Sequence, residues 1–322
     1  MTHWLSDSAL ERLREAADSP DLSETRYRLV DKLGQGGMGG VFRVEDPALN
    51  RQVAMKVISA PDPEGDWSGR LLQEARVIAK LEHPGIVPVH DAGVLPDGRP
   101  YYTMKLVQGR RLDEHVATVQ GLSDRLRVFL RICETVGFAH AHGVLHRDLK
   151  PGNVMVGPFG EMLVMDWGLS KLMSTLEVDI GSSEPPLAGA SEQRGGTAHG
   201  TVMGTLGYMA PEQTRAESLD QRADVYSLGA ILQFLLTDSS PVPRPLAAIR
   251  KQAMAVDRLE RYQAVQDLAT DVAHFLDGLQ VSAYPEGPLM RAWRWIVRNR
   301  VWILLLLAYA ATRALLIFFR PR

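Results

Sequence analysis

The sequence predicts an α+β protein with a small strand-rich N-terminal part, a larger helical part and one apolar helix near its C-terminal end. From Tyr27 to about residue 106, short runs of β-branched and aromatic residues alternate with glycines and turn pairs, which is typical of strands. From about Leu112, apolar residues recur at helical spacing. Residues 301–319 form the one long apolar run. With 45% hydrophobic residues in 322, the chain can bury a substantial core, which excludes wholesale disorder and fibrous or repeat architectures.

The predicted elements follow in order along the chain. A short accessory helix is expected over residues 6–17, and a helix over 68–81 carries apolar residues on one face. Residues 174–200 are rich in Ser, Gly, Thr, Glu and Pro, which predicts a functional loop rather than a packed element. Strands are expected at residues 28–33, 41–45, 52–58, 87–94 and 101–106, and further helices at 125–142, 219–236 and 262–278.

Charge and cysteine content narrow the class of partner. The chain has 36 Lys and Arg against 38 Asp and Glu, a balance that argues against a nucleic-acid partner. The single cysteine, Cys133, cannot form an internal disulfide, so the fold needs no oxidising compartment.

A glycine-rich segment, Gly34-Gln35-Gly36-Gly37-Met38-Gly39-Gly40, lies between the first two predicted strands. Glycines let a backbone approach a phosphate and point its amides at it. Dinucleotide sites use the same spacing, but here the turn leads into a strand and no acidic residue follows at the right place. The pattern therefore argues against a Rossmann site.

Lys56 ends the segment Val53-Ala54-Met55-Lys56 on the next predicted strand. A lysine among small apolar residues needs an anionic partner, and phosphates plus a carboxylate would serve. Glu74, on the predicted helix 68–81, can supply the carboxylate. These two residues alone are equally consistent with a solvated strand lysine and a helix surface charge.

A third motif decides between these interpretations. His146-Arg147-Asp148-Leu149-Lys150-Pro151-Gly152-Asn153 is followed by Asp166-Trp167-Gly168, then by Gly204-Thr205, Ala210-Pro211-Glu212 and Asp224. In this order and spacing the motifs resemble the eukaryotic-type (Hanks-type) serine/threonine protein kinases, the bacterial branch in particular. The resemblance runs from about Tyr27 to Leu279.

The resemblance implies a bilobal protein-kinase fold and transfer of the γ-phosphate of ATP to Ser/Thr hydroxyls of proteins, with Mg²⁺ or, alternatively, Mn²⁺. It implies that Asp148 orients the attacking hydroxyl and that Lys150 stabilises the γ-phosphate. Asn153 would complete the catalytic set and, with Asp166, provide oxygen ligands for the metal. The implied ATP-binding residues are Leu33, Gly34, Gly36, Gly39, Val41, Ala54, Lys56, Glu74, Met104 and Asp166.

Within this set, the resemblance gives each group a task. Lys56, held by Glu74, would grip the α- and β-phosphates, Val41 and Ala54 would sandwich the adenine, and Met104 would lie at the back of the pocket. Outside the chemistry, Glu212 would pair with Arg261. Arg147 would pair with a phosphate on the activation segment, and self-phosphorylation is expected within residues 174–203, with Thr197 and Thr201 as the first candidates.

Three departures from the family pattern stand out. Trp167 replaces the usual Phe after the metal-binding aspartate, and a larger ring could shift the balance between active and inactive states. The activation segment, residues 166–212, is lengthened by the loop at 174–200. The stretch between Leu236 and Arg261 is short, so we expect a reduced docking surface there.

Residues 301–319 are expected to form a transmembrane helix, because nineteen helical residues span roughly 28 Å and this run is apolar all round. Arg313 opposes this assignment, and a buried or interfacial helix is the alternative. With this span, the chain would divide into an accessory helix (1–26), a kinase domain (27–280, with lobes 27–106 and 107–280), a basic linker (281–300) and the membrane helix (301–319). The kinase domain would face the cytoplasm, tethered to the bacterial cytoplasmic membrane, and paired spans would give a homodimer.

The leading functional interpretation is an active kinase acting on protein substrates. The alternatives are an ATP-binding pseudokinase or scaffold module, which would normally lose Lys56, Asp148 or Asp166, and a small-molecule kinase. Small-molecule kinases of this fold lack the Ala-Pro-Glu segment that this chain keeps at Ala210–Glu212.

Overall fold

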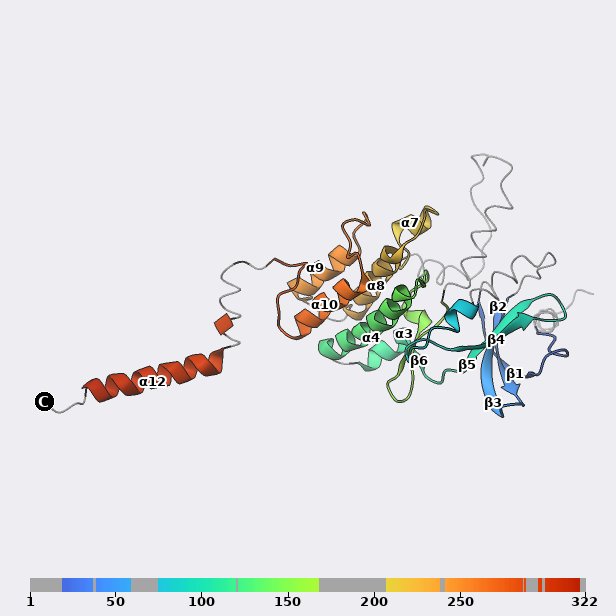
Figure 1. Ribbon diagram of the computed structural model, residues 1–322, viewed down its shortest axis with the longest axis horizontal. Helices are drawn as coiled ribbons and strands as arrows, with labels where there is room; N and C mark the ends of the chain where they lie inside the picture. Colours follow the sequence, from blue (N-terminus) through green and yellow to red (C-terminus); the bar gives the residue numbers. More distant parts are fainter. Residues whose placement is uncertain are drawn as a thin grey trace, which may run out of the picture.

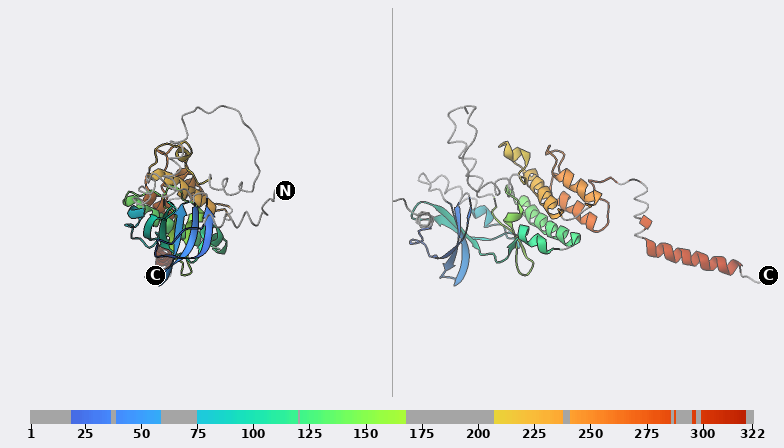
Figure 2. Two further views of the ribbon diagram at one scale, coloured as in Figure 1. Left: turned by 90° about the vertical axis from the view of Figure 1, so that its right-hand side faces the viewer. Right: turned by 180° about the vertical axis from the view of Figure 1, so that it is seen from behind.

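A five-stranded sheet and a helical lobe lie side by side in the computed structural model, and the helix α12 lies apart from both (Figure 1; Figure 2). The structure describes residues 19–36, 39–58, 75–119, 121–167, 207–237, 241–285, 287, 295–296 and 299–318. The predicted accessory helix and the loop at 174–200 lie outside these residues. Of the predicted helix 68–81, the structure describes a helical turn at 75–78, where Ala75 and Ile78 are buried as the pattern indicates.

The N-terminal sheet has the strand order β1-β2-β3-β5-β4, and all neighbouring strands are antiparallel. The five predicted strands are confirmed to within a few residues at each end. The strands are β1 (Arg28–Gly36), β2 (Gly39–Asp46), β3 (Arg51–Ile58), β4 (Val89–Val94) and β5 (Pro100–Lys105).

Alternation along the strands divides the sheet into two apolar faces. The outer face carries a small cluster of its own, which includes Val53, Met55 and Tyr101. The inner face contributes Ala54, Tyr102 and Met104 to the main core, which continues into the helical lobe. The inner face of the sheet therefore closes against the helical lobe.

The helical lobe is built around α4 (Leu122–Ala141) and α8 (Gln221–Leu235), both of which bury one side in the main core. These two and α10 (Val265–Leu276) confirm the predicted helices. The helix α9 (Arg244–Ala253) occupies the short stretch between Leu236 and Arg261 and was not predicted. Shorter helical elements are α3 (Leu112–His115), η1 (Val116–Thr118), η2 (Pro151–Asn153) and α7 (Pro211–Thr214).

A second, three-stranded sheet lies at the junction of the two lobes, with the order β6-β7-β8. Its strands are β6 (Arg110–Arg111), β7 (Val154–Val156) and β8 (Met162–Val164). Val164 also forms a parallel bridge with Ile86, just before β4, and its amide donates to the Gly85 carbonyl at 2.8 Å. This small sheet therefore ties the strand-rich lobe to the loop that follows β8.

The predicted membrane span is wrong. No helix within the described residues is both long and apolar enough to cross a bilayer. The helix α12 (Arg300–Phe318) contains Arg300 and Arg313, and the uncharged stretch between them covers about 18 Å against a hydrocarbon thickness of about 30 Å. The expectations of a membrane tether, of a single-pass location in the cytoplasmic membrane and of a homodimer paired through spans lose their basis with it.

Candidate active site

Lys56 and Asp166 are 110 residues apart in sequence and form an ion pair between the two lobes. The Lys56 Nζ donates to Asp166 Oδ1 at 2.7 Å, and the side chains are only 12% and 32% exposed. Burial opposes the charge on both groups, but Tyr102 and Asp166 outweigh it at Lys56 and raise its pKa. At Asp166, Lys56 likewise outweighs burial and lowers the pKa. Both groups are therefore charged at neutral pH.

Four of the predicted nucleotide-binding residues share the inner face of the sheet. Val41 pairs with Lys56 across β2 and β3, and Ala54 pairs with Met104 across β3 and β5. Directly opposed residues of an antiparallel pair point to the same face, as do residues two apart on one strand. The small Ala54 beside Met104 thus leaves an apolar floor next to the Lys56 ammonium. Leu33, on the edge strand β1, is 41% exposed.

In the glycine-rich segment, Gly36 ends β1 and Gly39 begins β2, and these two residues oppose each other. A Cβ at Gly39 would collide with the Val57 carbonyl of β3, and the backbone there has a φ of +152°. Glycine is therefore required at position 39 for β2 to pass this close to β3, the strand that carries Lys56. Gly34 has nothing within 4 Å of its Cβ position, so its backbone is open to a ligand.

The three predicted catalytic residues are held together by their own hydrogen bonds. Lys150 Nζ donates to Asp148 Oδ2 at 3.0 Å, and Asn153 Nδ2 donates to the same oxygen at 3.1 Å. Asn153 Nδ2 also donates to the Asp148 carbonyl at 2.8 Å. These contacts fix the orientation of the Asp148 carboxylate before any substrate arrives.

The β7–β8 hairpin brings Asn153 and Asp166 together. Asn153 directly precedes β7 and Asp166 follows β8 by two residues, and Val154 pairs with Val164 between them. The Met165 amide donates to the Asn153 carbonyl at 2.8 Å and continues the contact past the strands. The 13 positions from Asn153 to Asp166 in the sequence therefore correspond to this hairpin.

Asn153 and Asp166 fit a magnesium ion by the chemistry of their donor atoms. The Asn153 amide directs its nitrogen at Asp148, so its oxygen is on the other side, and a carboxylate and an amide oxygen are the ligands that Mg²⁺ prefers. Within the described residues no group of three or more His, Cys, Asp or Glu could hold a metal. This donor set suits a metal that keeps waters and takes its remaining ligands from phosphates.

Residues 146–153, which carry the predicted catalytic residues, are called the catalytic loop below. Asp224, in the first turn of α8, is 1% exposed and holds the backbone of this loop. Its carboxylate accepts from the amides of His146 at 2.8 Å and Arg147 at 2.9 Å, and from His140 Nε2 at 2.7 Å. Burial raises the pKa of Asp224, but the His140 contact and the other bonds outweigh it and lower the pKa below its ordinary value. The carboxylate is therefore ionised, and hydrogen bonds from three donors offset the cost of burying its charge.

His146 adds a second support from beneath the loop. Burial lowers its pKa, so the ring is neutral at neutral pH. Its Nε2 faces the Met165 carbonyl at 2.9 Å and must donate there, which leaves Nδ1 to accept the Asp148 amide at 3.3 Å. One imidazole thus links the residue before Asp166 to Asp148.

Two residues of the site have left-handed backbone conformations. Arg147 has a φ of 66° and Asp166 a φ of 56°. For residues other than glycine this conformation costs conformational free energy, so it persists only where surrounding contacts hold it in place. At Arg147 the surroundings are the Asp224 carboxylate on the amide and Gln213 Nε2, which donates to the carbonyl at 2.8 Å.

Trp167 fills the site behind Asp166 and is 2% exposed. Its indole Nε1 donates to the Val164 carbonyl at 3.0 Å, and its ring lies 4.8 Å from the His146 ring between centroids. A phenylalanine could provide the ring contact but not the hydrogen bond. The departure from the family's Phe therefore adds an anchor for the backbone on which Asp166 lies.

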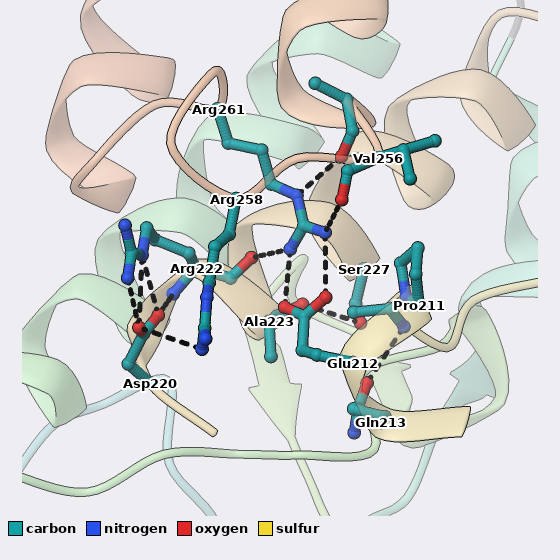
Figure 3. A network of polar contacts seen from close by, with 12 residues as sticks. Pro211, Glu212, Gln213, Asp220, Arg222, Ala223, Ser227, Val256, Arg258 and Arg261 are labelled. Atoms are coloured by element: carbon teal, nitrogen blue, oxygen red, sulfur yellow. Dashed lines mark hydrogen bonds and ion pairs between the residues drawn. The ribbon is translucent and has the colours of Figure 1, made fainter. Parts of the chain in front are cut away.

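The predicted pair between Glu212 and Arg261 is confirmed and is bidentate (Figure 3). The two nitrogen–oxygen distances are 2.7 and 2.8 Å, and both side chains are almost fully buried. Arg261 also donates to the carbonyls of Ala255, Arg222 and Val256. The pair fixes α7, whose Gln213 contacts Arg147, against the loop that precedes α10.

Among the predicted site residues, the structure joins Lys56 with Asp166, and Asp148 with Lys150 and Asn153. Glu74, Gly168 and Thr205 lie outside the described residues. Sequence reasoning missed the contact of Gln213 with the catalytic loop, the supporting role of His140 and the position of Tyr102 next to Lys56. For Tyr102 a signal existed, since a tyrosine two residues before Met104 on a buried strand needs a polar partner.

The fold and the site together define a protein kinase domain, and comparison with known proteins agrees. Residues 27–283 match the family model described as the protein kinase domain, so the chain belongs to the protein kinase family.

The relatives are bacterial serine/threonine-protein kinases. The chain is 34% identical over 297 residues to PknD of Protochlamydia amoebophila, and this match covers 78% of this chain and 30% of the relative. It is 34% identical over 299 residues to PknD of Chlamydia felis, and this match covers 79% of this chain and 31% of the relative. The chain thus spans about a third of the length of these relatives.

Among solved structures, the kinase domain of PknI from Mycobacterium tuberculosis superposes with a TM-score of 0.56 at 25% identity. The superposition covers 78% of this chain and 96% of that domain. The resemblance to bacterial Hanks-type kinases stated from the sequence is confirmed.

Proposed function

We propose that this chain is an active serine/threonine protein kinase that transfers the γ-phosphate of ATP to hydroxyls of protein substrates. The observation that carries the proposal is the arrangement of Asp148, Lys150 and Asn153, joined by hydrogen bonds of 2.8 to 3.1 Å, beside the ionised Lys56–Asp166 pair. A pseudokinase has no need to keep all of these groups.

The transfer needs little covalent chemistry from the protein, because its transition state is loose and most of the catalysis is positioning and charge stabilisation. The substrate hydroxyl oxygen attacks the γ-phosphorus as the bond to the β-phosphate oxygen breaks and ADP leaves. Asp148 orients the hydroxyl and takes its proton. Lys150, on the Asp148 carboxylate at 3.0 Å, would balance the charge that grows on the γ-phosphate.

The nucleotide would lie under the β1–β2 hairpin and against the inner face of the sheet. Val41 and Ala54 would contact the adenine, Met104 would close the back of the pocket, and Lys56 would turn from Asp166 to the α- and β-phosphates. Asn153 and Asp166 would hold Mg²⁺, which when bound neutralises phosphate charge.

The test is incubation of the full chain with radiolabelled ATP, Mg²⁺ and a general protein substrate. We expect wild type to transfer phosphate, and Asp148→Asn to bind ATP almost as well while transfer falls by about 10²- to 10⁴-fold. Lys56→Met should weaken ATP binding and transfer together. The matched control is Asp277→Asn, a carboxylate-to-amide change at an exposed position after α10, which should leave both unchanged.

Two outcomes would contradict the proposal. Wild type that binds ATP but transfers nothing indicates the pseudokinase or scaffold alternative. Asp148→Asn with near wild-type turnover shows that the catalytic assignment is wrong.

Self-phosphorylation within residues 174–203 forms part of the same proposal, and its support is the number of Ser and Thr residues in a long segment between Asp166 and Glu212. Peptide mapping of the self-labelled chain should find phosphate there. Phosphate found only in other parts of the chain would contradict this part of the proposal.

A further inference from the structure

After α10 the chain turns back and is fastened to the helical lobe before it continues towards α12. At the turn, the Leu279 amide donates to the His274 carbonyl at 2.7 Å. Residues 281–284, here called the C-terminal segment, then pack on the main core: Val281 is 2% exposed, and Tyr284 is half-buried against the same cluster. The chain therefore leaves the lobe from a fixed point, on the side away from the five-stranded sheet (Figure 1).

One carboxylate holds the C-terminal segment. Asp271, on α10, is 3% exposed, and its Oδ1 accepts the Ser282 amide at 2.7 Å. Its Oδ2 accepts the Ser282 hydroxyl at 2.8 Å, the Ala283 amide at 3.0 Å and the Tyr262 hydroxyl at 2.8 Å. Four donors thus offset the burial of its charge, and three of them belong to the C-terminal segment.

The Ser282 hydroxyl is the accessible member of this network. Ser282 is exposed, although the carboxylate that it contacts is buried. Without this hydroxyl, Asp271 would still accept from two amides and from Tyr262, so the carboxylate does not depend on it. A phosphate on the same oxygen would remove the donated hydrogen and place a charge of about −1.5 to −2 against Asp271. The hydroxyl is therefore dispensable for the fold, but it is the point at which added negative charge would act on the buried carboxylate.

The surroundings offer such a phosphate no free cation. Ser282 lies at a hollow in the surface of the lobe that Asp267 and Asp271 also line, so the phosphate would face two carboxylates. Among the described residues that line this hollow, Arg261 is the one with a permanent positive charge. Its guanidinium is already bound to the Glu212 carboxylate and to three backbone carbonyls. Like-charge repulsion would therefore dominate at this position.

We propose that Ser282 is a phosphorylation site and that its phosphate releases the C-terminal segment from Asp271. The segment opens transiently, as the ends of domains do, and the freed hydroxyl enters the active site of a second copy of this chain. There the Ser282 Oγ forms a bond to the γ-phosphorus of ATP, the bond to the β-phosphate oxygen breaks, ADP leaves, and the hydroxyl proton passes to Asp148. The phosphate then prevents the segment from closing again, and Val281 loses its place in the core.

A second copy is the donor because the active site lies between the two lobes, whereas the chain leaves the helical lobe on its far side (Figure 1). This inference rests on the proposed function, because the phosphate comes from the kinase activity of the chain itself.

The release is tested on the full chain with phosphoserine incorporated at position 282 during translation. The hydrogen-exchange protection factor of the Ala283 amide should fall at least tenfold relative to wild type, while exchange in the buried helix α4 stays unchanged. Ser282→Ala should lower it less than about threefold, because the amide and Tyr262 contacts of Asp271 remain. The matched control carries phosphoserine at Ser123, an exposed serine in the first turn of α4, and should protect Ala283 as wild type does.

The modification is tested by mixing wild type with the full-length Asp148→Asn variant, which carries a mass tag and serves as an inactive acceptor. With ATP and Mg²⁺, peptide mapping should find phosphate on Ser282 of the tagged chain. Ser282→Ala in the tagged chain should remove that phosphate and leave phosphate at other sites.

Wild type that labels other sites but never Ser282 overturns the inference. Equal protection of Ala283 in wild type and in the chain with phosphoserine at 282 also overturns it, as does an equal loss with phosphoserine and with Ser282→Ala, because the charge then has no effect of its own. A wild-type chain that labels no protein defeats the proposed function and the donor named here, whereas the incorporated phosphoserine still decides whether a phosphate at this position releases the C-terminal segment.

Discussion

Replacing Arg261 should show how much more a buried ion pair contributes to the stability of this fold than an exposed one. Its guanidinium makes two bonds to Glu212 and three to backbone carbonyls, at 2.7 to 3.2 Å, and it is 2% exposed. Arg261→Met keeps the length of the side chain but removes every donor. Glu212 then remains as a buried carboxylate without its cation.

The expected cost follows from these contacts. Breaking a buried ion pair by removing one partner costs about 3–5 kcal/mol, mostly because of the uncompensated charge. For a domain of this size that corresponds to a fall in melting temperature of about 6–20 °C. The matched control is Arg215→Met, which breaks the exposed pair of Arg215 with Glu217, whose side chains are 56% and 41% exposed. An exposed pair of this kind is worth at most about 1 kcal/mol.

Urea unfolding of the three proteins, followed by tryptophan fluorescence, measures the free energies of unfolding. The double variant Glu212→Gln/Arg261→Met should be more stable than Arg261→Met alone, because it leaves no unpaired charge. Equal losses for Arg261→Met and Arg215→Met would refute the reasoning, as would a double variant less stable than Arg261→Met.

The pH dependence of the same comparison has a definite sign. Burial raises the pKa of Glu212, but its bonds to Arg261 outweigh burial and lower the pKa below the ordinary value. A carboxylate with a lowered folded-state pKa contributes stability that is present above its unfolded pKa, about 4.3, and is lost as the pH falls through the folded-state pKa. In Arg261→Met, burial without the cation raises the Glu212 pKa, so the unpaired carboxylate takes up a proton above the unfolded pKa and the variant recovers stability there. The difference in the free energy of unfolding between wild type and Arg261→Met should therefore be largest at neutral pH and narrow steadily as the pH falls.

Two further variants test other supports of the site and of the domain end. Trp167→Phe keeps the ring beside His146 but removes the indole donor from the Val164 carbonyl, which then keeps only the Val87 amide at 3.4 Å. Calorimetry should show a loss of about 1 kcal/mol, and an unchanged melting temperature would show that the indole N–H is not an anchor. Asp271→Ala removes the carboxylate that accepts from the amides of Ser282 and Ala283 at 2.7 and 3.0 Å. Hydrogen exchange of these two amides should accelerate at least tenfold, while exchange in the buried helix α4 stays unchanged. Equal protection of the two amides in wild type and variant would refute this prediction.

The sequence predicted the strands well because strands depend on local patterns. Alternation indicated the five strands, and the motifs placed Asn153 and Asp166 near each other, since a short hairpin keeps the two close in sequence and in space. The helix α9 was missed because its apolar stripe is short and begins after prolines, with Leu246, Ile249 and Ala253 as its buried residues.

The membrane span failed for a different physical reason. Average hydrophobicity over residues 301–319 was high, but a span depends on an uninterrupted apolar length, and Arg313 divides it. The Arg313 Nε donates to the Tyr309 hydroxyl at 3.1 Å, one turn earlier in α12. The positions of Arg300 and Arg313, rather than the average hydrophobicity, set the length of the uncharged stretch between them.

The position of Tyr102 opposite Lys56 could not be predicted from motif spacing, because it depends on strand register. A shift of one residue between β3 and β5 would move the phenol to the outer face and Tyr101 to the inner one. The motifs name the groups that do chemistry, but the register of ordinary strands decides which buried polar groups contact them.

A chain of contacts connects the buried Arg261–Glu212 ion pair to the backbone next to Asp148. Arg261 holds Glu212 on α7, Gln213 of the same turn donates to the Arg147 carbonyl, and Asp224 accepts from the Arg147 amide. Because Arg147 holds a left-handed conformation, its backbone needs both contacts, and Asp148 is the next residue. The loss of Arg261 should therefore loosen the orientation of Asp148 and also lower the stability of the helical lobe. At a temperature where Arg261→Met is still folded, we expect its kcat to fall while its affinity for ATP, which depends on the other lobe, stays close to that of wild type.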